Sequence, residues 1–378
     1  MAVILAFLAG ELAYGVNGIS PPHPDEVWTL RVLDMPLDAI SSYIFAQDNH
    51  PPLYYLVAKV WSLVIGKGID SIRLLSCLFG GLALAAILAF ACLYRRISLL
   101  VPLLLLASNP LFVHYSSTVR PYSMVVFLTA LATLSGLHLR HSILAERTSI
   151  FLPLARNPGR LVLILTFYSS CLLLALTHYY GTLYALILLA WDFVETHICR
   201  RRVPPMLVAL AALIWPFCHF LIGSSASQIE SNSWVRVFPF VSTLNNVLMA
   251  LFPVQLISVK PHFVFNLSLI LVIALILRPV HARWSLPAFA DLTTIMASKE
   301  AYLALPIVVL YLFSAVVDLV HPFSTPYYFL VALPSSVVLM GIILAFIRRT
   351  FSSIPAFVLL SGVVCSQLLL AHQRLLLP

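Results

Sequence analysis

Two acidic side chains, Asp25 and Glu26, directly follow the first hydrophobic segment of a chain that is otherwise mostly apolar. The same loop ends in the run DNHPPLYY at positions 48–55, and Arg120 lies in a later joint between two apolar runs. An ionised side chain beside a membrane helix is costly unless it stays among the headgroups or faces a wet cavity. Acidic residues at this place therefore predict a functional site that moves a proton, an ion or a sugar.

The elements that must position these residues are membrane helices. Hydrophobic residues make up 61% of the 378 residues and charged residues only 10%, with a mean hydropathy of +1.00. This composition excludes a soluble globular protein. Since a spanning helix needs roughly 20 apolar residues, the sequence predicts an all-α polytopic membrane protein with about eleven transmembrane helices in one integral domain, residues 1–378. We expect helices near residues 2–19, 73–94, 97–113, 123–139, 161–177, 181–197, 203–222, 263–277, 301–319, 327–346 and 351–371.

The segment at 53–66 is apolar but too short to span a membrane. Its apolar residues recur at helical spacing, while Tyr55, Lys59 and Ser62 share the opposite face. This pattern predicts an amphipathic helix that lies in the membrane interface, within a long outer loop at 20–72.

Charge placement predicts the orientation, because Lys and Arg accumulate in cytoplasmic loops. With the N-terminus inside, the cytoplasmic joints receive 14 of the 22 basic residues and the outer joints receive 8 of the 14 acids, Asp25 and Glu26 among them. The acidic loop is therefore expected on the extracytoplasmic side. The net charge of +8 is attributed to orientation and to contact with anionic membrane lipids. No soluble basic face indicates nucleic-acid binding.

Metal and nucleotide chemistry receive little support. The six cysteines are scattered singly without CxxC spacing, so neither a disulfide framework nor a zinc site is indicated. No phosphate loop, HExxH or GxSxG run occurs. Asp48, His50 and His178 could together hold a divalent cation, but their spacing does not require one. We expect no obligatory metal and no other cofactor.

Several motifs occur in a distinctive order: Asp25-Glu26, HPPLYY at 50–55, IRLLSCLFGG at 72–81, SNPLFVHYSSTVRPYS at 108–123 and THYYG at 177–181. In order and spacing they resemble the GT-C superfamily of integral membrane glycosyltransferases, in the branch of the protein O-mannosyltransferases and the lipid A aminoarabinose transferase. The resemblance covers roughly residues 1–190. We expect this part to form the catalytic core and residues 191–378 to form a carrier-binding half.

The resemblance implies an inverting glycosyltransferase. Such enzymes move one sugar from a polyprenyl-phosphate donor to a hydroxyl of a lipid, glycan or protein acceptor on the outer side of a membrane, here expected to be a bacterial inner membrane. Single displacement at the anomeric carbon needs a base for the acceptor proton and a cation for the leaving phosphate. By position, Asp25 is the candidate base, and Glu26 is the neighbour that orients the acceptor.

Phosphate binding is assigned first to Arg120, because it lies in an outer loop and its guanidinium fork matches phosphate oxygens. Contact with lipid headgroups is the other explanation for this arginine. Lys59 and His50 are further phosphate candidates, although snorkelling would explain the lysine and turn capping the histidine. Substrate contacts are expected from Tyr55, Tyr122, His178 and Tyr179, of which the last two would also suit an interfacial aromatic belt.

The sequence departs from the resemblance at one place. Relatives often carry an Arg-Tyr pair where this chain has Pro326-Tyr327, at the start of its tenth predicted helix. The departure removes one phosphate contact, so Arg120 would carry more of that task, or Lys260 would help.

Two other functions are compatible with the sequence. One is a multi-helix transporter or lipid-carrier flippase that uses Asp25 and Glu26 as a proton or cation site, although no internal repeat typical of transporters is visible. The other is a non-catalytic scaffold subunit of an envelope-glycan assembly. The glycosyltransferase hypothesis requires Asp25 and Arg120 to share one site, and opposite membrane faces would exclude it. The sugar and the acceptor are not encoded in a short motif.

Overall fold

The computed structural model describes residues 22–48, 50–93, 100–146, 158–198, 205–219, 299–320 and 325–350, with five positions between 243 and 250. Every regular element in these ranges is a helix, which confirms the all-α prediction for this part of the chain. The helices predicted near 2–19, 263–277 and 351–371 lie outside the described residues, as does Lys260.

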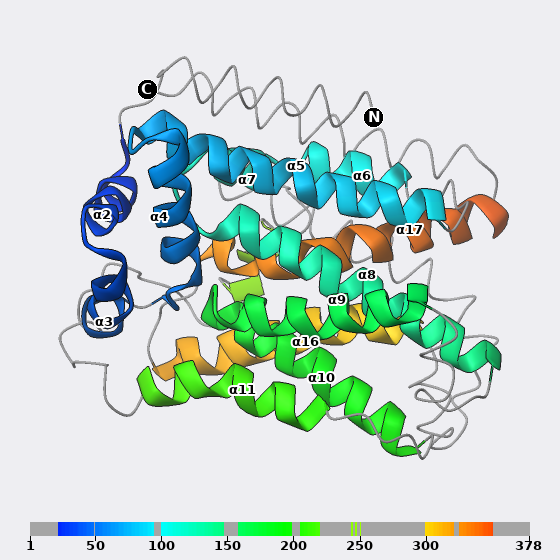
Figure 1. The fold of residues 1–378 in the computed structure, drawn as a ribbon. Helices are drawn as coiled ribbons and strands as arrows, with labels where there is room; N and C mark the ends of the chain where they lie inside the picture. Colours follow the sequence, from blue (N-terminus) through cyan, green and yellow to red (C-terminus); the bar gives the residue numbers. More distant parts are fainter. Residues whose placement is uncertain are drawn as a thin grey trace.

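The body of the molecule is a set of helices that lie alongside one another (Figure 1). The helix α8 lies between α5 and α9 and packs against both. Four stretches, at 69–90, 122–140, 299–319 and 326–345, are long and apolar enough to cross a membrane. The chain is therefore an integral membrane protein. The helices of this bundle are α5 (Ile69–Leu93), α8 (Tyr122–Glu146), α9 (Pro158–Ala175), α10 (Tyr179–Ile198), α11 (Pro205–Cys218), α16 (Lys299–Val320) and α17 (Leu333–Thr350).

Three shorter helices lie across one end of the bundle: α2 (Pro24–Leu33), α3 (Leu37–Gln47) and α4 (Leu53–Ile65) (Figure 1). The sequence predicted only one helix between residues 20 and 72, so that part of the prediction was incomplete. All three helices begin at or directly after a proline. Proline favours a helix start because its missing N–H would have no partner there. These short helices lack the long apolar run that reveals a membrane span.

Helix α4 is amphipathic, as the sequence predicted. Its apolar side chains Leu63 and Val64 are 66% and 77% exposed, whereas Tyr55 and Lys59 are buried in the protein. The polar face therefore turns inward, and the exposed apolar face suits contact with lipid. The helix ends at Gly66, whose φ of 121° is accessible to glycine and strained for other residues.

The single helix predicted at 97–113 is wrong, because the chain breaks it into α6 (Leu100–Ala107) and α7 (Pro110–Ser116). Asn109 caps α7: its Oδ1 accepts the N–H of Phe112 at 3.0 Å. A residue before proline avoids the helical conformation, and Asn is a favoured N-cap. The predicted helix at 327–346 also begins differently, as a 3-10 segment η4 (Pro326–Ala332) that continues into α17.

Candidate active site

Asp25 lies in the first turn of α2. His23 caps this helix: its Nδ1 accepts the backbone N–H of Asp25 at 3.3 Å, and Pro24 occupies the first helical position. The positive end of the helix dipole favours a carboxylate here. The Asp25 side chain is 49% exposed, so a substrate can reach this carboxylate.

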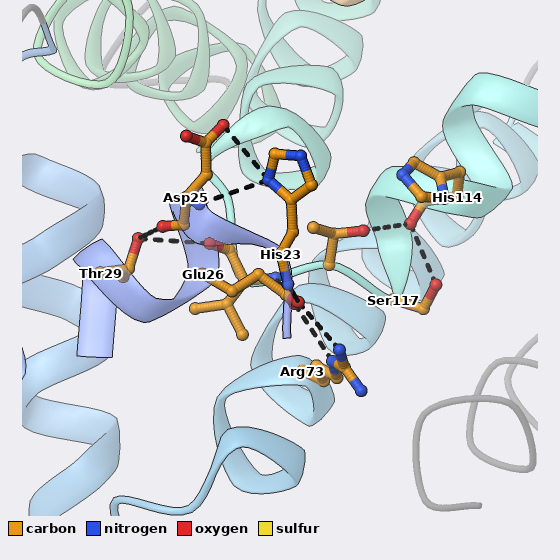
Figure 2. A network of polar contacts seen from close by, with 9 residues as sticks. His23, Asp25, Glu26, Thr29, Arg73, His114 and Ser117 are labelled. Atoms are coloured by element: carbon orange, nitrogen blue, oxygen red, sulfur yellow. Dashed lines mark hydrogen bonds and ion pairs between the residues drawn. The ribbon is translucent and has the colours of Figure 1, made fainter. Parts of the chain in front are cut away.

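Glu26 follows Asp25 but is turned into the protein, where it is only 2% exposed. Its carboxylate accepts Nε and Nη2 of Arg73 from α5 at 3.1 and 2.8 Å, as Figure 2 shows, and the N–H groups of Val119 and His23 at 2.9 and 3.0 Å. Burial alone would raise the pKa of Glu26, but these donors, Arg73 first, hold it below its usual range. The geometry thus makes Glu26 a tie between α2, α5 and the Val119 backbone, while the acceptor contact that the sequence suggested stays a prediction.

The loop between α7 and α8 is held by side chains of α2. Glu26 accepts the N–H of Val119, and the hydroxyl of Thr29 donates to the carbonyl of Val119 at 3.3 Å. Val119 is the residue before Arg120. Its N–H and its carbonyl are therefore bound by two side chains of α2 that lie one helical turn apart. Because Asp25 belongs to the same turn, the positions of Asp25 and Arg120 are mechanically coupled.

Arg120 reaches Asp25, with its Nη2 3.4 Å from Oδ2 of the carboxylate. The guanidinium side chain is only 11% exposed. Burial would lower the pKa of Arg120, but Tyr122, Tyr55 and the carboxylates of Asp25 and Asp48 outweigh it and place the pKa above its usual range. Arg120 is therefore a permanent cation. The requirement that Asp25 and Arg120 share one site is met.

A second carboxylate, Asp48, lies at the end of α3 and is 9% exposed. Its Oδ1 is 2.8 Å from Nδ1 of His50, and its Oδ2 accepts the hydroxyl of Tyr55 at 2.5 Å and the indole N–H of Trp28 at 3.0 Å. Burial would raise the pKa of Asp48, but His50, Tyr55 and Arg120 hold it well below its usual range. Tyr55, expected to touch substrate, instead has its hydroxyl on this carboxylate.

His178 lies beside His50 at the joint between α9 and α10, with the two ring centroids 5.2 Å apart. The start of α4 is tied to this joint because the N–H of Leu53 donates to the carbonyl of Leu176 at 3.1 Å. Nδ1 of His178 accepts the N–H of Tyr180 at 3.1 Å. Burial, with His50 and Arg120, lowers the pKa of His178 well below its usual range, so its imidazole is neutral.

Tyrosines line the side of the site next to Arg120. Tyr122 is buried, and its ring contacts those of Tyr115, Tyr327 and His178 at centroid distances of 4.6, 5.1 and 5.6 Å. Tyr327 belongs to η4 and is half-buried. Aromatic side chains therefore occupy the neighbourhood of Pro326, where the sequence lacks the expected arginine. A residue of the second half of the chain thus contributes to the site, while the division at residue 190 stays a prediction.

Two of the expected site residues are bound elsewhere. Nζ of Lys59 donates to the carbonyl of Leu33 at 2.7 Å, so it caps the end of α2 from the buried face of α4. The phosphate contact expected from Lys59 stays a prediction. The hydroxyl of Tyr179 is 2.6 Å from Nδ1 of His219 beyond α11, which engages this tyrosine in helix packing.

Within the described ranges, no three His, Cys, Asp or Glu side chains gather as metal ligands. The expectation of no obligatory metal stays a prediction. The sequence assigned no role to Thr29 and considered Asp48 only as a possible ligand of a divalent cation. Asp48 had a signal in the DNHPPLYY run, but its contact with Trp28 joins residues 20 positions apart and appears only in the folded chain.

No protein-family model and no curated protein matches this chain. Among solved structures, it is similar to ArnT from Cupriavidus metallidurans, bound to undecaprenyl phosphate, with a TM-score of 0.53 at 15% identity over 91% of this chain and 60% of that one. The apo state of the same ArnT gives a TM-score of 0.50 at 16% identity, over 90% and 59% of the two chains. The chain thus spans about 60% of the length of these structures. The chain therefore shares the GT-C-like fold of these ArnT structures.

Proposed function

We propose that this protein is an inverting glycosyltransferase that moves one sugar from a polyprenyl-phosphate donor to a hydroxyl of a lipid, glycan or protein acceptor. The observation that carries the proposal is the contact of Asp25 with Arg120, 3.4 Å apart at one end of a GT-C-like bundle. An exposed carboxylate beside a buried guanidinium supplies the base and the phosphate-binding cation that the reaction needs. The undecaprenyl phosphate bound to the ArnT neighbour supports a donor of this class.

Each group has one task in the reaction. The acceptor oxygen attacks the anomeric carbon while the bond from that carbon to the phosphate oxygen breaks, and its electron pair stays on the phosphate. Asp25 takes the acceptor proton, and Arg120 binds the phosphate as its negative charge grows. Tyr327, which is half-buried beside the buried Tyr122, offers aromatic surface for the sugar ring. Burial of Arg120 strengthens its attraction for phosphate because less water screens the charge.

We place the site on the extracytoplasmic side. Basic residues at the opposite end of the bundle support this orientation. Lys299 and Arg160 lie at the starts of α16 and α9, whereas Arg348 lies at the end of α17. These are the helix ends remote from α2, α3 and α4 (Figure 1). By the positive-inside rule, the basic residues at those ends favour the cytoplasmic side, which supports an outward-facing site at α2, α3 and α4.

The test uses purified protein in lipid vesicles with a radiolabelled polyprenyl-phosphate sugar. The D25N variant should lose transfer by about 10²- to 10⁴-fold, the typical contribution of a general base, and should still bind donor. The D34N variant is the matched control, since Asp34 is 74% exposed and contacts only the exposed Lys67 at 3.4 Å. Uptake of substrate into vesicles that depended on Asp25, without any glycosidic product, would identify a transporter instead.

A further inference from the structure

Asp48 is a buried carboxylate at the end of α3 for which the reaction described above has no task. Its Oδ2 accepts the indole N–H of Trp28 at 3.0 Å and the hydroxyl of Tyr55 at 2.5 Å, and its Oδ1 lies 2.8 Å from Nδ1 of His50. Both oxygens are thus already engaged, which argues against a second base. The contacts with Trp28 and Tyr55 instead join the end of α3 to α2 and to α4.

Trp28 lies on α2, three residues after Asp25. Three residues correspond to about 300° around an α-helix, so Trp28 projects about 60° to one side of Asp25, while Glu26 projects about 100° to the other. Both flanks of Asp25 are therefore anchored, by Trp28 on Asp48 and by Glu26 on Arg73 of α5. A helix that is bound on two sides resists rotation about its own axis.

The anchor of Trp28 is itself fixed to the bundle. Tyr55 of α4 is fully buried and donates to the same carboxylate oxygen. The start of α4 is bound in turn, because the N–H of Leu53 donates to the carbonyl of Leu176, directly after α9. The ring of Trp28 also stacks on Tyr43 of α3 at a centroid distance of 5.7 Å. The position of Trp28 is thus set by α3, α4 and the bundle as well as by α2.

A small rotation of α2 would move the carboxylate of Asp25. Side chains reach roughly 6 Å from the axis of a helix, so a turn of about 10° displaces the end of a side chain by about 1 Å. A misplacement of about 1 Å can cost 10²-fold in rate. The contact of Asp25 with Arg120, at 3.4 Å, is longer than the roughly 2.7–2.9 Å of a strong charged hydrogen bond. The orientation of α2, more than this contact, therefore directs the carboxylate.

We propose that Asp48 is a positioning residue that acts through Trp28: it sets the rotation of α2 and thereby directs the carboxylate of Asp25 toward the acceptor hydroxyl. This inference rests on the proposed function. In this role Asp48 touches neither the acceptor nor the carrier lipid. It keeps the base at the place where the acceptor proton leaves, and the bonds that form and break are those described above.

The test replaces Trp28 with phenylalanine in the full chain. W28F removes the N–H that Asp48 accepts and keeps an aromatic ring against Tyr43. W61F is the matched control, because Trp61 is also half-buried and donates its indole N–H to the carbonyl of Ser71 at 2.8 Å, which ties α4 to α5. Each variant loses one indole hydrogen bond, so the two unfolding temperatures should fall alike. Only W28F should lower kcat, roughly 10- to 100-fold, with little change in KM for the donor.

A double-mutant cycle tests whether Trp28 acts through Asp25. In the D25N background the base is gone, so W28F should cause no further loss of the residual transfer. A loss by the same factor in both backgrounds would show that Trp28 acts independently of Asp25 and would overturn the inference. W28F with the kcat of W61F would overturn it as well. D48A removes the acceptor and answers the question if W28F does not fold, since a D48A kcat equal to that of W61F has the same meaning.

Thiol labelling separates this inference from the proposed function, because it needs no substrate. D25C in the full chain is treated with a water-soluble maleimide, and wild type is the blank for the native cysteines. Adding W28F should speed labelling at position 25 by about fivefold, the shift in equilibrium that one hydrogen bond of typical strength controls, whereas W61F should not. Equal rates in all three proteins refute the tie even in an active enzyme. Faster labelling in a protein that makes no glycosidic product supports the tie while the proposed function fails.

Discussion

Replacing Glu26 with glutamine should destabilise the protein more than any other single change of an acidic residue in α2 or α3. The change leaves the guanidinium of Arg73, 9% exposed, without its counter-ion. Breaking a buried ion pair from one side costs about 3–5 kcal/mol. For a chain of 378 residues that corresponds to a fall of about 4–6 °C in unfolding temperature. Thermal unfolding in detergent, followed by tryptophan fluorescence, measures the shift.

A double-mutant cycle separates the charge effect from the loss of packing. E26Q combined with R73M removes both charges, so the double variant should be more stable than the sum of the single effects predicts, by about 1–3 kcal/mol. D38N is the control, because Asp38 is exposed in the first turn of α3. Its unfolding temperature should match wild type. Additive single effects, or an E26Q protein as stable as wild type, would refute the idea that this pair fastens α2 to α5.

The same pair predicts the direction of acid sensitivity. The pKa of Glu26 is lower in the folded protein than in the unfolded chain. Its stabilisation is therefore fully present above the unfolded pKa, about 4.3, and is lost as the pH falls through the folded pKa. Wild type should lose stability below about pH 4. E26Q should show a shallower loss over the same range, which unfolding temperatures recorded at several pH values will reveal.

Three further changes test individual contacts. R120K keeps the charge but loses the guanidinium fork, so the affinity for undecaprenyl phosphate, measured by microscale binding, should fall roughly 10- to 100-fold. K59M removes the donor to the Leu33 carbonyl and should lower stability by about 1–3 kcal/mol with unchanged phosphate affinity; a selective loss of affinity would place Lys59 in the phosphate site. G181A would place a Cβ 2.6 Å from a backbone carbonyl of α9 and should lower the unfolding temperature, whereas G68A, with nothing within 4 Å, should not.

The membrane helices were predictable because their evidence is local. An apolar run of about 20 residues reveals a span without knowledge of its neighbours, and α5, α8, α9, α10 and α16 all begin and end within a few residues of their expected ranges, apart from the longer end of α8. The break at Asn109 also had a local signal, an N-cap residue followed by proline. The continuous hydrophobicity on both sides outweighed it in the sequence prediction.

The site was only partly predictable because its geometry depends on distant contacts. Asp25 and Arg120 could be singled out because both are unusual charges at the outer ends of apolar segments. The contacts of Glu26 could not be predicted, since its partners Arg73 and Val119 lie 47 and 93 positions away in the sequence. The contact of Lys59 with the Leu33 carbonyl was not predictable for a related reason: the helical pattern identified its polar face, but not whether that face meets water or protein.

Asp25 and Glu26 are neighbours in the first turn of α2, but their side chains have different surroundings. Successive residues of an α-helix point about 100° apart, so when one side of α2 faces the protein and binds Arg73 of α5, the neighbouring side chain points away from it. Glu26 takes the buried position and fastens both the helix and the Val119 backbone. Asp25 is left half exposed beside Arg120. Glu26 holds the loop of that arginine through the N–H of Val119. In the proposed reaction, the base Asp25 and the phosphate-binding Arg120 thus keep a fixed relation because Glu26 binds the backbone next to Arg120.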